Sequence, residues 1–151
     1  MNQVARILLV EDDPRDAELA LLALKDYRLA NEIVLCHDGE EAMDYLCRRG
    51  QYSDRPAGNP LVVLLDLKLP KVDGLEVLHQ IRADPQLRPL PVVILTSSRE
   101  EQDLVRGYAL GVNAFVVKPV RFDRFIEALK EISVFWLVIN EPPPGCVSRG
   151  G

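Results

Sequence analysis

Five short apolar runs, separated by longer amphipathic segments, constrain the fold of this 151-residue chain more than any other feature. Each run is too short for a helix, and most are rich in Val and Ile, which favour strands. The runs are unbroken rather than alternating, so both faces of each strand should be buried, as in a parallel sheet covered by helices. The predicted strands are Ile7–Val10, Ile33–Cys36, Leu61–Leu65, Val92–Leu95 and Phe115–Val117.

The segments between these runs carry the start signals of helices, namely a capping residue followed by Pro or, three positions later, by Glu. The capping residues are Asp13, Asp38, Asp73 and Ser98. Five strands that alternate with five helices require right-handed crossovers. We therefore predict an α/β fold over residues 1–132, a doubly wound five-stranded parallel sheet with five flanking helices. Residues 49–60, rich in Gly, Pro and polar side chains, are predicted to form a long loop.

Composition and charge argue against several classes of protein. The net charge is -5 and no basic cluster follows the chain, so binding of nucleic acid through its phosphates is not expected. No apolar run approaches the roughly 20 residues that span a bilayer, and the N-terminus does not resemble a signal peptide. The three cysteines, Cys36, Cys47 and Cys146, show no CxxC spacing and are expected to be free thiols in a reducing cytoplasm.

Polar residues stand at the carboxyl ends of four predicted strands. They are Glu11 and Asp12 after the first strand, Asp66 after the third, Thr96 after the fourth and Lys118 after the fifth. Ligands of open α/β sheets bind beyond these strand ends. We therefore expect these side chains to converge, with Asp66 delivered to a cleft rather than buried in the core.

The combination of residue types indicates phosphoryl chemistry. Three carboxylates in one cleft repel each other unless a cation compensates, and Mg²⁺ accepts carboxylate, water and phosphate oxygens. A carboxylate can attack phosphorus to form an acyl phosphate, while the metal and Lys118 stabilise the transferred group and Thr96 donates a hydrogen bond to it. Singly, each residue has an ordinary alternative: Asp12 or Asp13 as a helix cap, Thr96 as a strand-end hydroxyl, and Lys118 as a solvated lysine.

Over about residues 5–132 the chain resembles the receiver domain of two-component response regulators, through ILLVEDDP, VVLLDLKLPKVDG, VVILTSS and NAFVVKPV. The resemblance implies a flavodoxin-like fold and a phosphoryl group accepted on Asp66 from the phosphohistidine of a sensor histidine kinase. It implies that Mg²⁺ is held by three carboxylates and one backbone carbonyl, and that two further residues bind the phosphoryl group. The metal ligands would be Glu11, Asp12, Asp66 and the carbonyl of Lys68, and the phosphoryl ligands Thr96 and Lys118.

The same resemblance has two further implications. Lys118-Pro119 would be a cis peptide, which is favourable only before proline. Phe115 would be the switch aromatic, whose ring moves inward when Thr96 moves towards the phosphoryl group. Ordinary core packing remains the alternative role of Phe115.

The loop at 49–60 and the stretch FWLVINEPPP look like those of the small single-domain regulators that partner bacterial phytochrome kinases. This narrower resemblance implies a homodimer made through a C-terminal arm, residues 133–151, with no separate output domain. Output would then pass through protein contacts or a phosphorelay. The expected interface residues are Phe135, Trp136, Leu137 and Ile139. The alternative is that they fold back as the last turn of the final helix.

Three rival functions are weaker. A phosphatase of the haloacid dehalogenase type needs a second acid two residues after Asp66, where the chain has Lys68. A flavin or nucleotide binder needs a Gly-rich phosphate loop after the first strand, where the chain has the acidic EDDPRD. A pseudo-receiver, which binds partners without phosphorylation, would be expected to lack one of the acids, the threonine or the lysine. We therefore expect a signalling protein that catalyses only its own phosphorylation and dephosphorylation.

Overall fold

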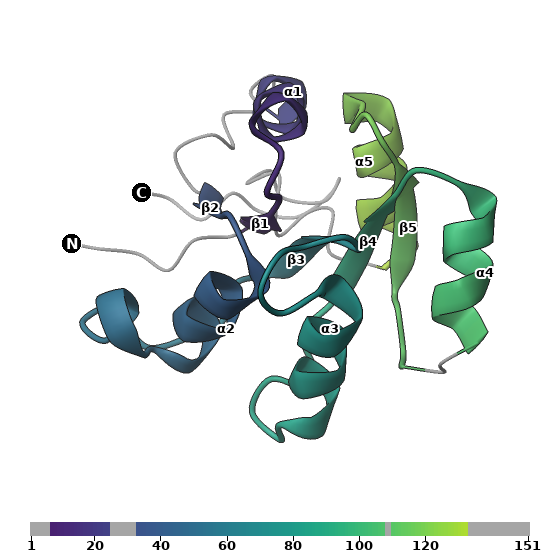
Figure 1. Ribbon diagram of the computed structural model, residues 1–151. Coiled ribbons are helices and arrows are strands. Elements are labelled where there is room, and N and C mark those ends of the chain that lie inside the picture. Colours follow the sequence, from purple (N-terminus) through teal and green to yellow (C-terminus); the bar gives the residue numbers. More distant parts are fainter. Residues whose placement is uncertain (1–6, 25–32, 108–109, 133–151) are drawn as a thin grey trace, which may run out of the picture.

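A single parallel sheet with strand order β2-β1-β3-β4-β5 forms the centre of the molecule (Figure 1). The computed structural model describes residues 7–24, 33–107 and 110–132. The strands are β1 (Ile7–Val10), β2 (Ile33–Cys36), β3 (Val62–Asp66), β4 (Val92–Thr96) and β5 (Ala114–Val117). The helices are α1 (Pro14–Leu24), α2 (Gly39–Cys47), α3 (Gly74–Ala83), α4 (Arg99–Gly107) and α5 (Phe122–Glu131). The predicted doubly wound α/β fold is confirmed.

The boundaries of two strands differ from the sequence prediction at the end that matters for function. Asp66 pairs in register with Leu95, so it is the last residue of β3 rather than the first residue after it. Thr96 likewise pairs with Val117 and ends β4. Backbone pairing with the neighbouring strand continues one residue beyond the apolar run, and it fixes the main chain of both polar residues.

Both faces of the sheet are covered, as the unbroken apolar runs predict. Successive side chains of a strand point to opposite faces: Val63 and Leu65 pack in the cluster beneath α2, α3 and α4, whereas Val62 and Leu64 pack beneath α1 and α5. Figure 1 shows α1 and α5 on one side of the sheet and α2 and α3 on the other. A polar side chain can therefore reach a ligand only at a strand end.

The predicted helix caps are present. Asp13 accepts hydrogen bonds from the amides of Arg15 and Asp16, at 2.8 and 3.2 Å. The side chains of Asp38, Asp73 and Ser98 each accept a bond from the amide three residues later. These bonds satisfy amide groups that have no partner within the helix.

Among the described residues, no helix is long and apolar enough to cross a membrane. Cys36 is buried and Cys47 half-buried, and both are free thiols, as expected. Cys146 and the proposed interface residues, which are Phe135, Trp136, Leu137 and Ile139, lie outside the described residues.

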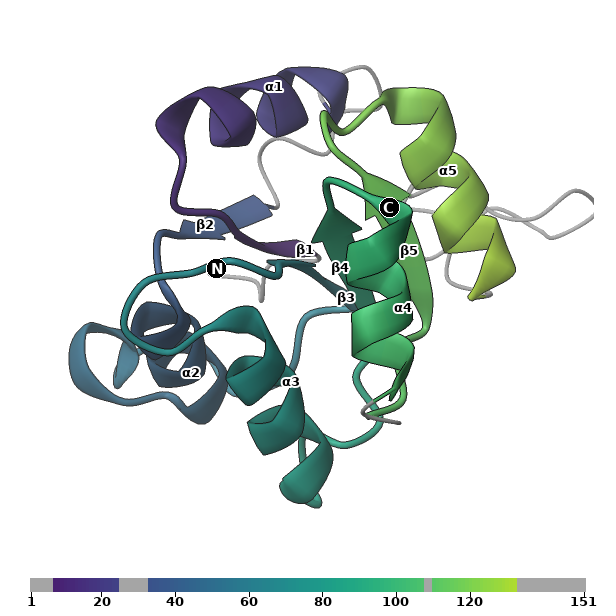
Figure 2. The same cartoon turned by 45° about the vertical axis from the view of Figure 1, so that its right-hand side comes forward.

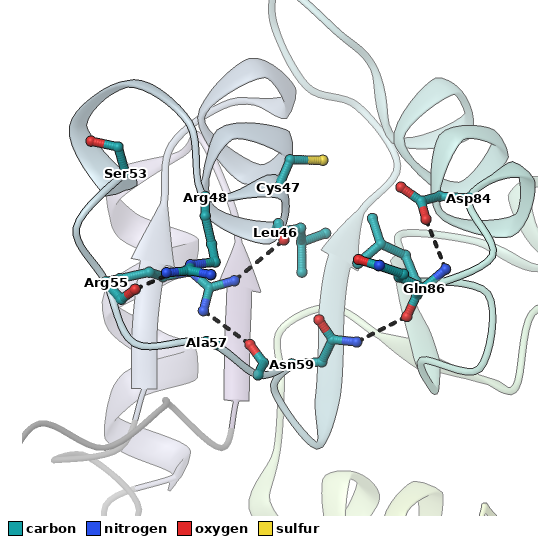
Figure 3. Close-up of a pocket in the computed structure, with 11 residues that line it drawn as sticks. Leu46, Cys47, Arg48, Ser53, Arg55, Ala57, Asn59, Asp84 and Gln86 are labelled. Carbon is teal, nitrogen blue, oxygen red and sulfur yellow. Dashed lines mark hydrogen bonds between the residues drawn. The ribbon is translucent and has the colours of Figure 1, made fainter.

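The segment 49–60 is a loop, as predicted, but a firmly anchored one. It begins with the 3-10 turn η3 (Gly50–Tyr52). The guanidinium of Arg55 lies 4.3 Å from the centre of the Tyr45 ring and donates a hydrogen bond to the Tyr45 carbonyl. It also donates to the carbonyl of Leu46 at the end of α2 (Figure 3). Arg55 thereby adds donors to carbonyl groups in the last turn of α2, where helices run short of amide partners; the Tyr45 carbonyl also accepts the Arg48 amide at 3.3 Å. The Asn59 amide, which donates to Gln86, ties the loop to the segment after α3.

Gly74, the first residue of α3, fixes the position of the β3 end. A Cβ atom at this residue would lie 2.3 Å from the carbonyl oxygen of Asp66 and 2.8 Å from the Cα of Leu67. The Gly74 amide also donates to the Leu67 carbonyl at 3.0 Å. Helix α3 can therefore begin directly against the backbone that carries Asp66 only because residue 74 has no side chain.

We predict that Gly74→Ala lowers the free energy of unfolding by about 1–3 kcal/mol, the usual cost of overpacking, because backbone atoms must move to admit the methyl group. Urea denaturation measures this change. The matched control is His79→Ala on the exposed side of α3, which should stay within about 0.5 kcal/mol of the native protein. Equal stability of both variants would show that the β3–α3 junction is pliable.

Candidate functional site

Side chains from four elements meet at the carboxyl edge of the sheet. The ammonium group of Lys118, just after β5, donates hydrogen bonds to three carboxylates. The distances from Nζ are 3.3 Å to Glu11 Oε1, 3.1 Å to Asp16 Oδ2 and 3.1 Å to Asp66 Oδ2. The three partners come from the end of β1, the first turn of α1 and the end of β3. All three ammonium protons therefore have a carboxyl oxygen as acceptor. Lys118-Pro119 is a cis peptide, as predicted.

Three of the acids also form a group that could hold a metal ion. Glu11, Asp12 and Asp66 each offer a carboxylate oxygen, and these oxygens lie within 4.8 Å of one another. With Asp16 the cluster holds four carboxyl groups and one ammonium group, so it would carry an excess of negative charge if all four were ionised. A hard divalent cation with oxygen ligands, such as Mg²⁺ or Mn²⁺, suits this donor set. The sequence prediction that these three acids converge is thus confirmed.

The expectation that Asp66 opens into a cleft is wrong for the arrangement seen here. Asp66 is only 3% exposed, because Lys118 covers one carboxylate oxygen and the Lys68 amide donates to the other at 3.4 Å. A cavity of about 620 Å³ is lined by Asp12, Lys68, Asp73 and Glu101, together with apolar side chains, and not by Asp66. The cavity therefore reaches the exposed edge of the acidic group rather than the Asp66 side chain itself.

Thr96 and Phe115 lie on neighbouring strands. Thr96 is fully buried, and its hydroxyl accepts a hydrogen bond from the Gln102 side chain at 3.4 Å. The Thr96 carbonyl accepts the amide of Lys118 at 2.7 Å, which joins the two strand ends. Phe115 is half-buried against the core cluster beneath α2, α3 and α4, and the Arg106 guanidinium lies 4.7 Å from its ring centre.

The sequence analysis did not assign Asp16 to the site. An acid in the first turn of a helix has an ordinary explanation in the helix dipole, so the pattern did not single it out. The position of Asp16 could have revealed its role. It lies four residues after Asp12, in a helix that starts at the carboxyl end of β1. Such a helix has its first turn at the same edge of the sheet, where Asp16 meets Lys118.

Burial and charge shift two pKa values in this cluster. Burial raises the pKa of the Glu11 carboxyl, and its hydrogen bond to Asp66 and the negative charge of Asp66 raise it further, to about 8. Burial also lowers the pKa of the Lys118 ammonium. The hydrogen bond and charge of Asp66, with the charge of Glu11, outweigh that effect and raise the Lys118 pKa above its ordinary value. Glu11 is therefore protonated at neutral pH when no cation is bound, and Lys118 is charged.

This shift predicts how stability depends on pH without a divalent cation. Since the folded pKa of Glu11 lies above the ordinary 4.5, its stabilising contribution is complete below that ordinary value and is lost as the pH rises through about 8. Between about pH 6 and pH 9 the free energy of unfolding should fall by about 2 kcal/mol.

Urea denaturation in a chelating buffer measures this fall. Glu11→Gln should flatten the dependence, whereas Glu18→Gln, at an exposed position of α1, should leave it unchanged. If Glu11→Gln kept the full pH dependence, the source would be another group.

Comparison with known proteins agrees with this geometry. The sequence matches the family described as "Response regulator receiver domain" over residues 7–130. Response regulator Rcp1 from Synechocystis sp. is 40% identical over 131 residues, which is 87% of this chain and 88% of Rcp1. The Mn²⁺-bound form of Rcp1 superposes with a TM-score of 0.66 at 35% identity, covering 95% of this chain and 98% of that structure.

Two other solved structures are similar. The bacteriophytochrome response regulator AtBRR is 62% identical with a TM-score of 0.84, over 89% of this chain and 96% of that chain. The phosphorylated cyanobacterial phytochrome response regulator RcpA is 41% identical with a TM-score of 0.70, over 89% and 95% of the two chains. The acidic group, the fold and these matches lead to one conclusion: the chain belongs to the response regulator receiver domain family.

Proposed function

We propose that this protein is a single-domain response regulator switched by a phosphoryl group on Asp66, which it accepts from a sensor histidine kinase of the phytochrome type. The observation that carries the proposal is the contact between Lys118 Nζ and Asp66 Oδ2 at 3.1 Å, beside the carboxylates of Glu11 and Asp12. This grouping supports the proposed roles: Asp66 as nucleophile, Lys118 as the cation for the transferred group, and the acids as metal ligands.

In the proposed reaction a carboxylate oxygen of Asp66 attacks the phosphorus of a phosphohistidine. The new O–P bond forms as the P–N bond breaks, and the electron pair of that bond returns to the imidazole, which takes up a proton. Lys118 must release its bond to Asp66 and turn to the phosphoryl oxygens, where its charge stabilises the transferred group. Hydrolysis of the acyl phosphate by water resets Asp66. The protein thus catalyses only its own modification.

We propose that Glu11, Asp12, Asp66 and the backbone carbonyl of Lys68 hold Mg²⁺. The donor set supports this, since oxygen ligands with room for water suit a small hard cation. The Lys68 amide contacts Asp66 Oδ1 at 3.4 Å. The main chain of Lys68 therefore runs next to the acidic group, which supports its carbonyl as the fourth ligand. When bound, the ion would neutralise the negative charge that four carboxylates leave uncompensated.

Asp66→Asn tests the proposal. In the presence of Mg²⁺ the native protein should incorporate labelled phosphate from a phosphohistidine donor, and the label should be lost in hydroxylamine, which cleaves acyl phosphates. Asp66→Asn should lose at least about 99% of the labelling, because an amide is a very poor nucleophile towards phosphorus. The control is Asp54→Asn, which makes the same change at an exposed acid in the 49–60 loop.

Two results would count against this function. Full labelling of Asp66→Asn would move the acceptor to another residue. No labelling of the native protein by any histidine kinase donor would favour the pseudo-receiver, a module that binds partners without phosphorylation. The presence of Asp66, Thr96 and Lys118, the three residues that phosphorylation would require, favours the phosphorylated switch over the pseudo-receiver.

The proposed switch couples Thr96 to Phe115. Thr96 would move to a phosphoryl oxygen and leave Gln102, which now donates to its hydroxyl. The Phe115 ring would then turn inward into the space that Thr96 vacates. Phenylalanine has no hydroxyl to hold it outward, and the Arg106 guanidinium over the ring supplies a cation–π contact in its place. The α4–β5–α5 surface borders both residues and would carry the signal.

Relatives support the choice of kinase partner. AtBRR and RcpA are phytochrome response regulators, and RcpA was solved in its phosphorylated form. The identity to AtBRR, 62%, supports a phytochrome-type histidine kinase as the donor for this protein.

We further propose a homodimer formed through residues 133–151, with Phe135, Trp136, Leu137 and Ile139 at the interface. The support is their unbroken apolar sequence; each side chain removed from water contributes about 1.5–3 kcal/mol. Truncation after Ser133 should therefore give a folded monomer at micromolar concentration by light scattering, with an unchanged far-UV spectrum. A truncated protein that remained dimeric would exclude the arm as the interface.

A further inference from the structure

We propose that Glu101 is a positioning residue that holds the β4–α4 connection in the arrangement seen here and thereby opposes phosphorylation at Asp66. The inference deepens the proposed function and rests on it. Glu101 lies in the first turn of α4, which Figure 2 shows alongside β4 and β5. It touches neither the acidic group nor Lys118, so any effect it has on the site must pass through other residues.

The Glu101 side chain binds Ser97, the residue that follows Thr96. One carboxylate oxygen accepts both the amide of Ser97, at 2.7 Å, and the hydroxyl of Ser97, at 3.0 Å. Hydrogen bonds to a carboxylate are shorter and stronger than those between neutral groups. They also lower the pKa of Glu101, the Ser97 amide most of all, so the side chain is charged at neutral pH. The main chain directly after Thr96 is therefore fixed to α4.

The second carboxylate oxygen of Glu101 reaches across to the β3–α3 loop. It lies 3.4 Å from Lys68 Nζ, and the amide of Lys68 contacts Asp66. The Lys68 side chain is 81% exposed, so water screens this ion pair and it adds little by itself. The two bonds to Ser97 carry most of the effect, and Lys68 contributes a small share by linking the two loops that flank Asp66.

The hydrogen bonds between Glu101 and Ser97 favour the arrangement without a phosphoryl group. The Thr96 hydroxyl is paired with Gln102, one residue after Glu101 on the same helix. To bring that hydroxyl to a group on Asp66, Thr96 must leave Gln102. In the proposed switch the connection that begins at Ser97 shifts with it, while the paired end of β4 stays in place, and Ser97 then gives up its bonds to Glu101. Any free energy those bonds contribute here is lost in the phosphorylated form, so they shift the equilibrium away from it.

A second role of Glu101 can be separated from this one. Its amide donates to the Ser98 hydroxyl in the helix cap, but that bond uses the backbone and survives any side-chain change. Glu100 is the matched control, because it is an exposed acid in the same first turn with the same relation to the helix dipole. Glu101→Ala and Glu100→Ala therefore both remove one negative charge from the first turn of α4. Only Glu101→Ala also removes the contacts with Ser97 and Lys68.

The experiment titrates each full-length variant with beryllofluoride in saturating Mg²⁺, and follows the backbone amide signals of Thr96 and Lys118 by NMR. Beryllofluoride with Mg²⁺ mimics a phosphoryl group on a carboxylate. Glu101→Ala should reach half-conversion at about fivefold lower beryllofluoride than the native protein, the lower end of typical coupling between sites. Glu101→Gln, which keeps the shape but not the charge, should fall between them. Glu100→Ala should match the native protein.

The outcomes separate the inference from the function it rests on. If the native protein gives no response, the proposed function fails. If it responds but Glu101→Ala converts no more readily than Glu100→Ala, the function stands and the inference is overturned. Damage to the fold would weaken binding rather than strengthen it, so a gain in affinity is not an effect of instability. If Glu101→Ala does not fold, Ser97→Ala, which removes only the hydroxyl bond, must show a smaller gain in the same direction.

Discussion

The ammonium group of Lys118 allows three carboxylates to approach each other at the end of the sheet. Without a cation, Glu11, Asp16 and Asp66 would repel one another in a region where water is largely excluded, and some would have to take up protons. Lys118 Nζ lies within 3.3 Å of an oxygen of each, and it thereby joins the ends of β1, β3 and β5 to α1. The same ammonium is the natural partner of a phosphoryl group, so the contact that stabilises the site must be exchanged when the site is used.

The remainder of the fold keeps this cluster at a strand end. Helices cover both faces of the sheet, which leaves the carboxyl edge as the place where polar side chains can gather. At that edge the backbone of Asp66 is fixed twice: by pairing with β4 and by the close approach of Gly74. The main chain of Asp66 is therefore held rigidly, whereas the loops that flank it depend on side-chain contacts such as those of Glu101. Rigid strand ends with adjustable loops suit the proposed function, in which the loops rearrange around a fixed acceptor.

The relatives and the site geometry give independent information about this protein. The family match and the 62% identity to AtBRR identify a receiver domain. The contacts of Lys118 and the acidic group assign chemistry to particular atoms. A fold alone would not do so, since one fold hosts many functions. Asp66 is only 3% exposed, so if it is the proposed acceptor, side chains must move before a donor can reach it.

Sequence alone determined the strands, the helix caps and the convergence of Glu11, Asp12, Asp66 and Lys118, because apolar periodicity and chain order fix which residues stand at the carboxyl ends of parallel strands. The Thr96 hydroxyl, expected at the same place, is paired with Gln102 instead. Only the tertiary structure decided that Lys118 covers Asp66, that Asp16 is the third partner of Lys118, and that Glu101 binds Ser97 as well as standing in a helix cap. Those contacts depend on side-chain directions and on distances between elements far apart in the chain, and local patterns carry no information about either.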